Sequence, residues 1–270
     1  SNLFKKRKFN GVIHLAASKA AGESMINPKK YSYNNIIAGI NLLNKCIEFS
    51  LTPFIFSSSA AVYGSPKYNP VDESHSTNPT SYYGYTKLLF ETNLEWYSKL
   101  YNLKYASLRY FNAAGYDIKK RIIGIEADSQ NLIPKIMKVA LGKSPYLSIF
   151  GNKYNTKDGT GIRDYVHVND LAKAHIKAFE YIINKKRNLI INLGTEKGYS
   201  VLEILNMAID ITKVDIPYKI KNSRKGDVDK LIASCLLAED FIGWSHPNSN
   251  LKKILESTWN IYKNSISLSD

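Results

Sequence analysis

The stretch Pro53-Phe54-Ile55-Phe56-Ser57-Ser58-Ser59 decides the fold, together with Tyr83-Gly84-Tyr85-Thr86-Lys87 at the start of a long helical pattern. The run of aromatic and β-branched residues predicts a buried strand that presents three serines at its carboxyl end. A helix over residues 81–101 would place Tyr83 and Lys87 on one face, one turn apart. Because parallel α/β sheets bind ligands at the carboxyl ends of their strands, this stretch predicts both a sheet and a site.

The tyrosine and the lysine are candidates for acid–base chemistry. A free phenol titrates near pH ~10, so it is a poor base at neutral pH. A nearby ammonium favours the phenolate, and Lys87 would therefore lower the pKa of Tyr83. The chain contains 19 tyrosines, so an exposed Tyr–Lys pair at this spacing can also arise by chance. The serine run favours the catalytic interpretation because it would end beside the pair.

The composition is that of a globular enzyme. The chain has 270 residues, of which 44% are hydrophobic and 22% charged, which is ordinary for a folded domain or two. No apolar run approaches the ~20 residues that span a bilayer, and no signal-peptide pattern is visible. We therefore expect a cytoplasmic protein without a membrane partner. Cys46 and Cys235 lack metal-ligand spacing and are expected to be reduced core thiols, with no metal site.

The net charge of +14 raises the possibility of a nucleic-acid partner. The basic residues occur singly or in short groups, without the interleaved aromatic residues of a known binding module, so no nucleic-acid partner is expected. A positive field also attracts small anionic substrates such as nucleotide sugars.

Apolar runs and helical periods alternate along the chain. Strands are predicted over residues 11–17, 53–56, 105–111 and 189–194, and helices over residues 31–49, 81–101, 131–142, 169–183 and 251–262. This alternation predicts parallel βαβ units in a doubly wound sheet. His14 lies inside the first apolar run and is best interpreted as a core histidine. Ser200 and Glu203 form a capping-box pattern that predicts a further helix start.

The segment Asp158-Gly159-Thr160-Gly161-Ile162-Arg163-Asp164-Tyr165-Val166-His167-Val168 carries much of the remaining polar information. Glycine-rich loops with an arginine commonly bind phosphates. From composition alone, a plain turn is an equally good interpretation.

These motifs together resemble the UDP-glucose 4-epimerase family of the extended short-chain dehydrogenase/reductases. The Tyr-x-x-x-Lys motif alone marks only the superfamily, whereas the block from Gly159 to Val168 is far more specific. The resemblance covers nearly the whole chain. It is carried by residues 14–20, 22–24, 57–64, Tyr83 and Lys87, 109–112, 150–152, 158–168 and 224–227.

The resemblance implies a role for each matched residue. Tyr83 would take the proton of the sugar 4-hydroxyl while hydride passes from C4 to NAD, and would return it after the 4-keto sugar turns over. Ser59 would bind the same oxygen, and Lys87 would hold the nicotinamide ribose. The implied NAD contacts are Leu15, Ala16, Ala17, Lys19, Asn34, Ser57, Tyr83, Lys87 and Tyr110. The implied UDP-sugar contacts are Ser59, Tyr83, Asn112, Asn131, Leu132, Ser148, Phe150, Arg163, Tyr165, Arg224 and Asp227, with both arginines facing the pyrophosphate.

The resemblance also implies an α/β fold with a Rossmann-like doubly wound parallel sheet and a smaller, interleaved α/β substrate domain. Residues 1–112 plus about 160–195 would form the NAD-binding domain, and about 113–159 plus 196–270 the nucleotide-sugar domain. The family opens with a Gly-x-x-Gly-x-x-Gly turn, which is absent before Gly11. We therefore expect a fragment whose sheet is N-terminally incomplete, with an exposed edge and weak NAD binding. The family also implies a homodimer, formed by the helices after Pro28 and Ser81.

The implied activity is interconversion of UDP-glucose and UDP-galactose. Related dehydratases carry acidic residues directly after the serine or threonine, where this chain has Ala60 and Ala61, so epimerisation is favoured over elimination of water. An epimerase of UDP-N-acetylhexosamines or UDP-uronic acids remains an alternative, because Leu231 near the sugar does not select one of them. A nucleotide-sugar-binding protein without activity is the alternative from another class.

Overall fold

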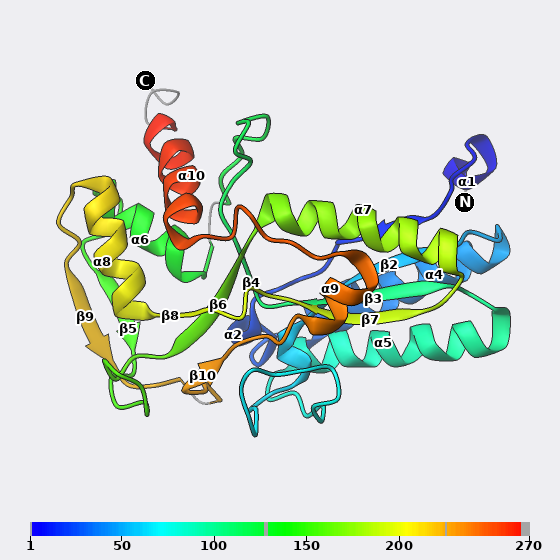
Figure 1. The fold of residues 1–270 in the computed structure, drawn as a ribbon, viewed down its shortest axis with the longest axis horizontal. Helices are drawn as coiled ribbons and strands as arrows, with labels where there is room; N and C mark the ends of the chain where they lie inside the picture. Colours follow the sequence, from blue (N-terminus) through cyan, green and yellow to red (C-terminus); the bar gives the residue numbers. More distant parts are fainter. Residues whose placement is uncertain (1, 127–128, 225, 266–270) are drawn as a thin grey trace.

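Four parallel strands form the main sheet, in the order β1-β2-β3-β7 (Figure 1). They are β1 (Val12–His14), β2 (Phe54–Ser59), β3 (Tyr105–Tyr110) and β7 (Leu189–Leu193). The computed structural model describes residues 2–126, 129–224 and 226–265. β2 lies between β1 and β3, with Phe56 opposite His14 and Ser59 opposite Tyr110. The serines therefore reach the edge of the sheet where parallel strands bind ligands.

Helices cover both faces of this sheet, as Figure 1 shows. On one face, α4 (Ala38–Glu48) and α5 (Tyr82–Tyr101) pack Leu43, Phe90 and Leu94 against the phenylalanines of β2. On the other, α7 (Val168–Lys185) and α9 (Leu236–Ile242) share a core with the remaining apolar strand residues. The predicted doubly wound α/β fold is confirmed.

A second core lies at the carboxyl-terminal end of the sheet. It is built from α6 (Leu132–Ala140), α8 (Val201–Thr212) and α10 (Leu251–Asn264), with β5 (Leu147–Phe150) paired to β9 (Tyr218–Lys221). A short sheet joins the two cores, in the order β10-β6-β4 with β8 paired to β6. Its strands are β4 (Asn112–Ala114), β6 (Ile162–His167), β8 (Gly198–Ser200) and β10 (Lys230–Leu231).

The two cores draw on interleaved parts of the chain. Cys235, Ala238 and Ile242 belong to the core of the main sheet although they follow α8 in sequence. The chain thus returns to the main sheet at α9 before α10 closes the second core.

Three expectations about local structure were wrong. The first strand covers only Val12–His14, because residues 15–20 leave the ladder with β2. The helix expected over residues 31–49 begins earlier, as α3 (Pro28–Tyr31), and passes through a π-helical turn, η1 (Ser32–Ile37). The segment after Gly161 is not a loop: its alternating Ile162, Asp164 and Val166 belong to strand β6, which pairs with β4, β8 and β10.

Other local predictions were confirmed. The capping box of Ser200 and Glu203 is formed on both sides at the start of α8. Cys46 and Cys235 are free and buried. His14 is buried among the rings of Phe54, Phe56 and Phe90.

No helix in residues 2–126, 129–224 and 226–265 is both long and apolar enough to cross a bilayer. The short elements α1 (Asn2–Lys6), α2 (Ala21–Ser24) and η2 (Ala60–Val62) complete the fold.

Candidate active site

The three serines at the end of β2 face different parts of the protein. Ser59 is in extended backbone, and its hydroxyl accepts a hydrogen bond from the Ala61 amide at 3.2 Å, which turns the chain into η2. The Ser57 hydroxyl bonds to the Tyr110 hydroxyl at the end of β3. The Ser58 hydroxyl donates to the buried carboxylate of Glu91. Of the three, Ser59 is the one whose hydroxyl is hydrogen-bonded to Tyr83.

Tyr83 lies in the first turn of α5, whose start is capped by the Ser81 hydroxyl. Burial raises the pKa of the Tyr83 phenol, and its hydrogen bond with Ser59 opposes that rise. Lys87 lies 5.8 Å from the centre of the Tyr83 ring, as predicted from the four-residue spacing. Among the described residues, the group that lowers the Tyr83 pKa is Ser59 rather than the expected Lys87. A phenol held in this way is protonated at neutral pH until a further positive charge enters the site.

Lys87 is buried at the carboxyl ends of β1 and β2. Its Nζ donates to the Ser57 carbonyl at 2.6 Å and lies 4.8 Å from the centre of the Phe56 ring. Burial lowers the Lys87 pKa to about 8, against an opposing effect of Glu91, and the Lys87 charge in turn helps lower the His14 pKa to about 4. His14 is therefore neutral at pH 7, in keeping with its interpretation as a core histidine.

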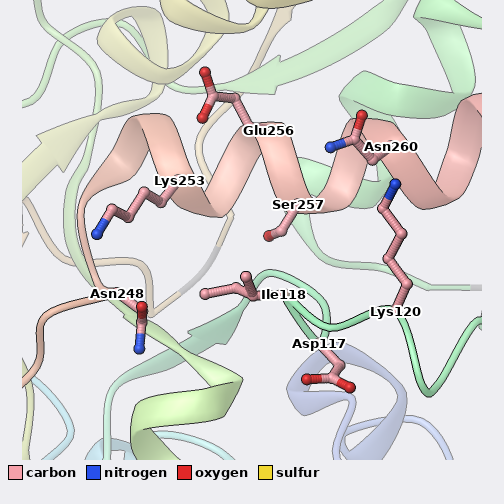
Figure 2. Close-up of a pocket in the computed structure, with 8 residues that line it drawn as sticks. All are labelled: Asp117, Ile118, Lys120, Asn248, Lys253, Glu256, Ser257 and Asn260. Atoms are coloured by element: carbon pink, nitrogen blue, oxygen red, sulfur yellow. The ribbon is translucent and has the colours of Figure 1, made fainter.

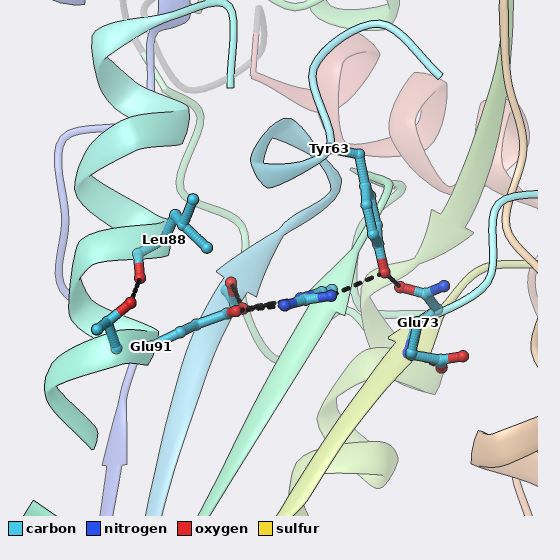
Figure 3. Close-up of polar contacts among 8 residues, drawn as sticks. Tyr63, Glu73, Leu88 and Glu91 are labelled. Carbon is cyan, nitrogen blue, oxygen red and sulfur yellow. Dashed lines mark hydrogen bonds and ion pairs between the residues drawn. The ribbon is translucent and has the colours of Figure 1, made fainter. Parts of the chain in front are cut away.

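A buried polar network lies behind the serines (Figure 3). The Arg109 guanidinium donates to the Glu91 carboxylate at 2.6 and 3.0 Å and to the Tyr63 hydroxyl at 3.1 Å. Tyr63 donates in turn to the Asn192 side-chain oxygen at 2.7 Å, and the Glu73 carboxylate accepts from the backbone N–H of Asn192 at 2.6 Å. The network joins α5, β2, β3 and β7, so it fixes α5, which carries Tyr83 and Lys87, against the sheet.

The sequence analysis did not find this network, although two signals were present. Glu91 follows Lys87 by one helical turn, so its carboxylate had to share the buried face. Arg109 lies inside an apolar strand, where an arginine is rarely buried without a partner.

The predicted NAD contacts lie at the carboxyl ends of β1, β2 and β3. Leu15, Ala16 and Ala17 follow β1 directly, and Tyr110 ends β3. Lys19 is turned toward the loop after β4, where its Nζ lies 2.8 Å from the Glu126 carboxylate. Asn34 in the π-helical turn donates to the Ser18 hydroxyl at 3.0 Å.

A residue that was not predicted holds this region together. The Asn35 side chain accepts from the Ser18 amide at 2.7 Å and donates to the Ser18 carbonyl and to the Thr86 hydroxyl, each at 3.0 Å. The Thr86 hydroxyl donates to the Tyr83 carbonyl at 2.7 Å. Asn35 therefore links the loop after β1 to α5. The π-helical turn that aims it is not visible in a residue pattern.

The nicotinamide end of NAD fits these residues on chemical grounds. Ala16 and Ala17 present only methyl groups, which allows a ligand to approach the backbone closely. The buried ammonium of Lys87 and the hydroxyls of Ser57 and Tyr110 suit a group with several hydroxyls. The described residues thus form a region with small side chains and several hydrogen-bonding groups, where the nicotinamide ribose would bind.

The predicted nucleotide-sugar contacts lie around the second core. Asn112 donates to the Asp164 carbonyl at 2.8 Å, Asn131 precedes α6, and Ser148 and Phe150 lie in β5. The Arg224 guanidinium is 3.9 Å from the centre of the Phe150 ring, and Arg163 lies 4.0 Å from the Asp227 carboxylate. The side chains of Leu132 and Tyr165 pack in or against the second core. Their substrate contacts, like the others, stay predictions.

Two hollows accompany this region. One of about 350 Å³ is lined by residues 151–154 and 220–223 and thus borders Phe150 and Arg224. Another of about 270 Å³ lies between α10 and the loop after β4 (Figure 2). Its lining residues include no predicted site residue, and they carry charges of both signs, Lys120 and Lys253 beside Asp117 and Glu256. Asp117 is already paired with Arg121 at 2.7 Å.

A doubly wound parallel sheet that presents serine, tyrosine and lysine at its carboxyl edge is typical of the short-chain dehydrogenase/reductase class. A family model described as GDP-mannose 4,6 dehydratase matches residues 1–258. The chain belongs to the NAD-dependent epimerase/dehydratase family.

The individual relatives point to epimerases within this family. The chain is 41% identical to the UDP-glucose 4-epimerase of Halalkalibacterium halodurans over 97% of its length and 78% of that protein. Its structure matches that of Brucella ovis UDP-glucose 4-epimerase in complex with NAD, with a TM-score of 0.93 and 38% identity, over 97% of this chain and 80% of that one. A UDP-N-acetylglucosamine 4-epimerase from Methanobrevibacter ruminantium matches with a TM-score of 0.83 and 28% identity, over 98% and 80% of the two chains.

Proposed function

We propose that this protein is a 4-epimerase that interconverts UDP-glucose and UDP-galactose. The observation that carries the proposal is the hydrogen bond between Ser59 and Tyr83 beside the buried ammonium of Lys87. The arginines at the other end, Arg163 and Arg224, suit the diphosphate of a nucleotide sugar. The relatives named UDP-glucose 4-epimerase support the same substrate.

The residues suggest how the reaction proceeds. Tyr83 would accept the proton of the sugar 4-hydroxyl, and Ser59 would orient that oxygen and help the proton move. When NAD is bound, the chemistry that it supplies is reversible hydride exchange at C4 of the sugar. The hydrogen bond with Ser59 opposes the increase in the Tyr83 pKa that burial causes, and a positive nicotinamide ring beside the phenol would favour the phenolate further. Tyr83 would then return the proton to the 4-oxygen, and return of the hydride to the opposite face of C4 would give the epimer.

A UDP-N-acetylhexosamine is the alternative substrate. Leu231 in β10 is opposite Arg163 in β6, next to the predicted diphosphate contact, and leucine leaves more room than an aromatic residue would. The similarity to a UDP-N-acetylglucosamine 4-epimerase supports this reading. Elimination of water is disfavoured, because Ala60 and Ala61 supply no carboxylate beside Ser59.

The test is direct conversion of the substrate. The protein is supplied with NAD and UDP-galactose, and UDP-glucose is measured; a parallel reaction contains UDP-N-acetylgalactosamine. Tyr83→Phe is the inactive control, because it removes only the phenolic oxygen. Conversion by the wild type that Tyr83→Phe abolishes supports the proposal. UDP-sugar binding without any conversion would favour a binding protein instead.

We also propose that the protein acts in the cytoplasm and that it forms a homodimer. The support for the homodimer is the exposed apolar surface on α5 and the π-helical turn beside it, which contains Tyr33, Ile37, Tyr85, Trp96 and Leu100.

A further inference from the structure

Lys87 is a buried ammonium near a buried carboxylate with which it does not pair. Glu91 follows it by four residues on α5, and the two residues are only 3% and 4% exposed. A lysine and a glutamate one helical turn apart commonly form an ion pair, and a buried charge needs one more than an exposed charge does. Within the part of the chain that the structure describes, Lys87 nevertheless forms no ion pair, and its Nζ donates to the Ser57 carbonyl at 2.6 Å.

Both oxygens of the Glu91 carboxylate are already occupied. The Arg109 guanidinium donates to one oxygen from Nη2 at 2.6 Å and to the other from Nε at 3.0 Å. The Ser58 hydroxyl donates to the second of these oxygens. The two parallel N–H groups of a guanidinium match a carboxylate in a way that an ammonium does not. Glu91 is therefore bound to β2 and β3 rather than to the lysine on its own helix.

Two consecutive residues of β2 keep the charges apart. The Ser57 carbonyl accepts from Lys87, whereas the Ser58 hydroxyl binds Glu91. An ammonium on the Ser57 carbonyl keeps two of its three N–H groups for a ligand at the carboxyl edge of the sheet. An ammonium paired with Glu91 would instead be drawn along α5 in the direction away from Tyr83.

We infer that Arg109 is a positioning residue: by holding Glu91, it keeps this carboxylate from pairing with Lys87. The ammonium then stays on the Ser57 carbonyl, where it is available to the ribose of the cofactor. This inference rests on the proposed function for the role of Lys87 in the reaction. Arg109 acts through Glu91 and Lys87 and takes no part in proton or hydride transfer.

The competing explanation is that the pair of Arg109 and Glu91 only holds α5 on the sheet. Removal of Arg109 would then release the helix, and removal of Glu91 as well could not restore it. If the pair instead keeps Glu91 from Lys87, removal of the carboxylate compensates for the loss of the arginine. The ionisable groups that face the ammonium are Tyr83 and Glu91 on α5 and the neutral His14 on β1. Glu91 is therefore the nearby charge that can respond.

The first measurement is the titration of Lys87, which requires no turnover. Its folded-state pKa follows from the pH dependence of the unfolding free energy, relative to the same protein with Lys87→Met. The wild type, in which burial lowers this pKa to about 8, should gain stability from that pH upward. In Arg109→Met the gain should begin about 1 pH unit higher or more, because the freed Glu91 favours the charged lysine. Adding Glu91→Gln should return the onset to pH 8 or below.

The second measurement is steady-state kinetics with NAD and UDP-galactose, at a temperature where thermal melting shows each variant to be folded. Arg109→Met should lower kcat about 10-fold or more with little change in KM, as displacement of a positioned group does. Arg109→Met combined with Glu91→Gln should recover most of kcat. Arg109→Lys keeps a cation on Glu91 and should lower kcat less than Arg109→Met.

Glu95→Gln is the matched control. Glu95 pairs with Lys99 at 2.7 Å on the same helix, also four residues apart, but this pair is exposed. The substitution should change neither kcat nor the titration of Lys87.

An unshifted Lys87 titration in Arg109→Met would overturn the inference, and so would a double variant as slow as Arg109→Met. If Arg109→Met does not fold, Arg109→Lys replaces it, with a smaller shift expected in the same direction. The outcome is separate from that of the proposed reaction. A shifted titration without any epimerisation would support the role of Arg109 and contradict the reaction, whereas epimerisation with an unshifted titration would do the reverse.

Discussion

The backbone N–H of Tyr83 donates to the Ser24 hydroxyl at 3.0 Å, so the start of α5 is capped by a residue 59 positions earlier in the chain. Ser24 is fully buried, and its own hydroxyl donates to the Ala21 carbonyl at 2.6 Å. Both hydrogen-bonding directions of Ser24 are therefore committed. Ser24 follows the predicted NAD contacts in sequence, and it therefore fixes the backbone of Tyr83, the predicted base.

Ser24→Ala should weaken both stability and catalysis. It leaves the Tyr83 amide without a partner, which costs about 1–3 kcal/mol of unfolding free energy. Because the phenol would no longer be held against Ser59, we expect kcat to fall about 10-fold or more with little change in KM. Urea denaturation and steady-state kinetics measure the two effects.

Ser32→Ala is the matched control, since the Ser32 hydroxyl bonds to the Tyr82 hydroxyl at 2.6 Å and not to Tyr83. It should keep kcat within about 2-fold of the wild type, because loss of a partly exposed hydrogen bond costs little. Equal effects of the two substitutions would show that Ser24 only stabilises the fold.

The ion pair between Glu91 and Arg109 should behave as a coupled unit. Arg109→Met leaves a buried carboxylate unpaired and should cost about 3–5 kcal/mol of unfolding free energy. Adding Glu91→Gln removes that charge and should recover part of the loss. A double-mutant cycle from urea denaturation measures the coupling. If the two single effects simply add, the pair does not act as a unit.

Residue types were enough to predict where the candidate catalytic residues lie on their strand and helix. An apolar run that ends in serines predicted the end of β2, and the four-residue spacing of Tyr83 and Lys87 predicted a shared face of α5. Periodicity identified these elements because each buries one side against a single neighbour.

Relationships between distant segments were not accessible in the same way. The bonds from Ser24 to Tyr83 and from Asn35 to Ser18 depend on a π-helical turn and on how three helices meet. The pKa of Tyr83 was expected to fall because of Lys87, yet burial raises it. Spacing indicates which charges share a face, whereas the extent of burial depends on the whole fold.

Stability above pH 8 should report the burial of Lys87. Its pKa is about 8 in the folded protein, below its value of 10.5 when exposed. Between these values the unfolded chain binds the proton and the folded protein does not, so stability rises with pH over this range. The gain is on the order of 3 kcal/mol.

Comparison with Lys87→Met isolates this effect, because all other titrating groups are shared. Urea denaturation from pH 7 to 10.5 should show the wild type gaining stability relative to the variant only above pH 8. A constant difference across that range would mean that the lysine is solvated in the folded protein.

The surface that carries Leu100 should mediate dimer formation. Leu100 is 67% exposed on α5, and Ile37, in the neighbouring π-helical turn, is 44% exposed. Exposed apolar side chains grouped on adjacent helices are typical of a subunit interface, which needs about 1,200 Å² or more of buried surface. Leu100→Glu places a charge in such an interface and should convert the dimer to a monomer in light scattering behind size exclusion. Ile176→Glu is the matched control, because Ile176 is 55% exposed on α7, which covers the opposite face of the sheet. It should leave the mass at twice that of the chain, and a wild type that runs as a monomer would contradict the proposed assembly.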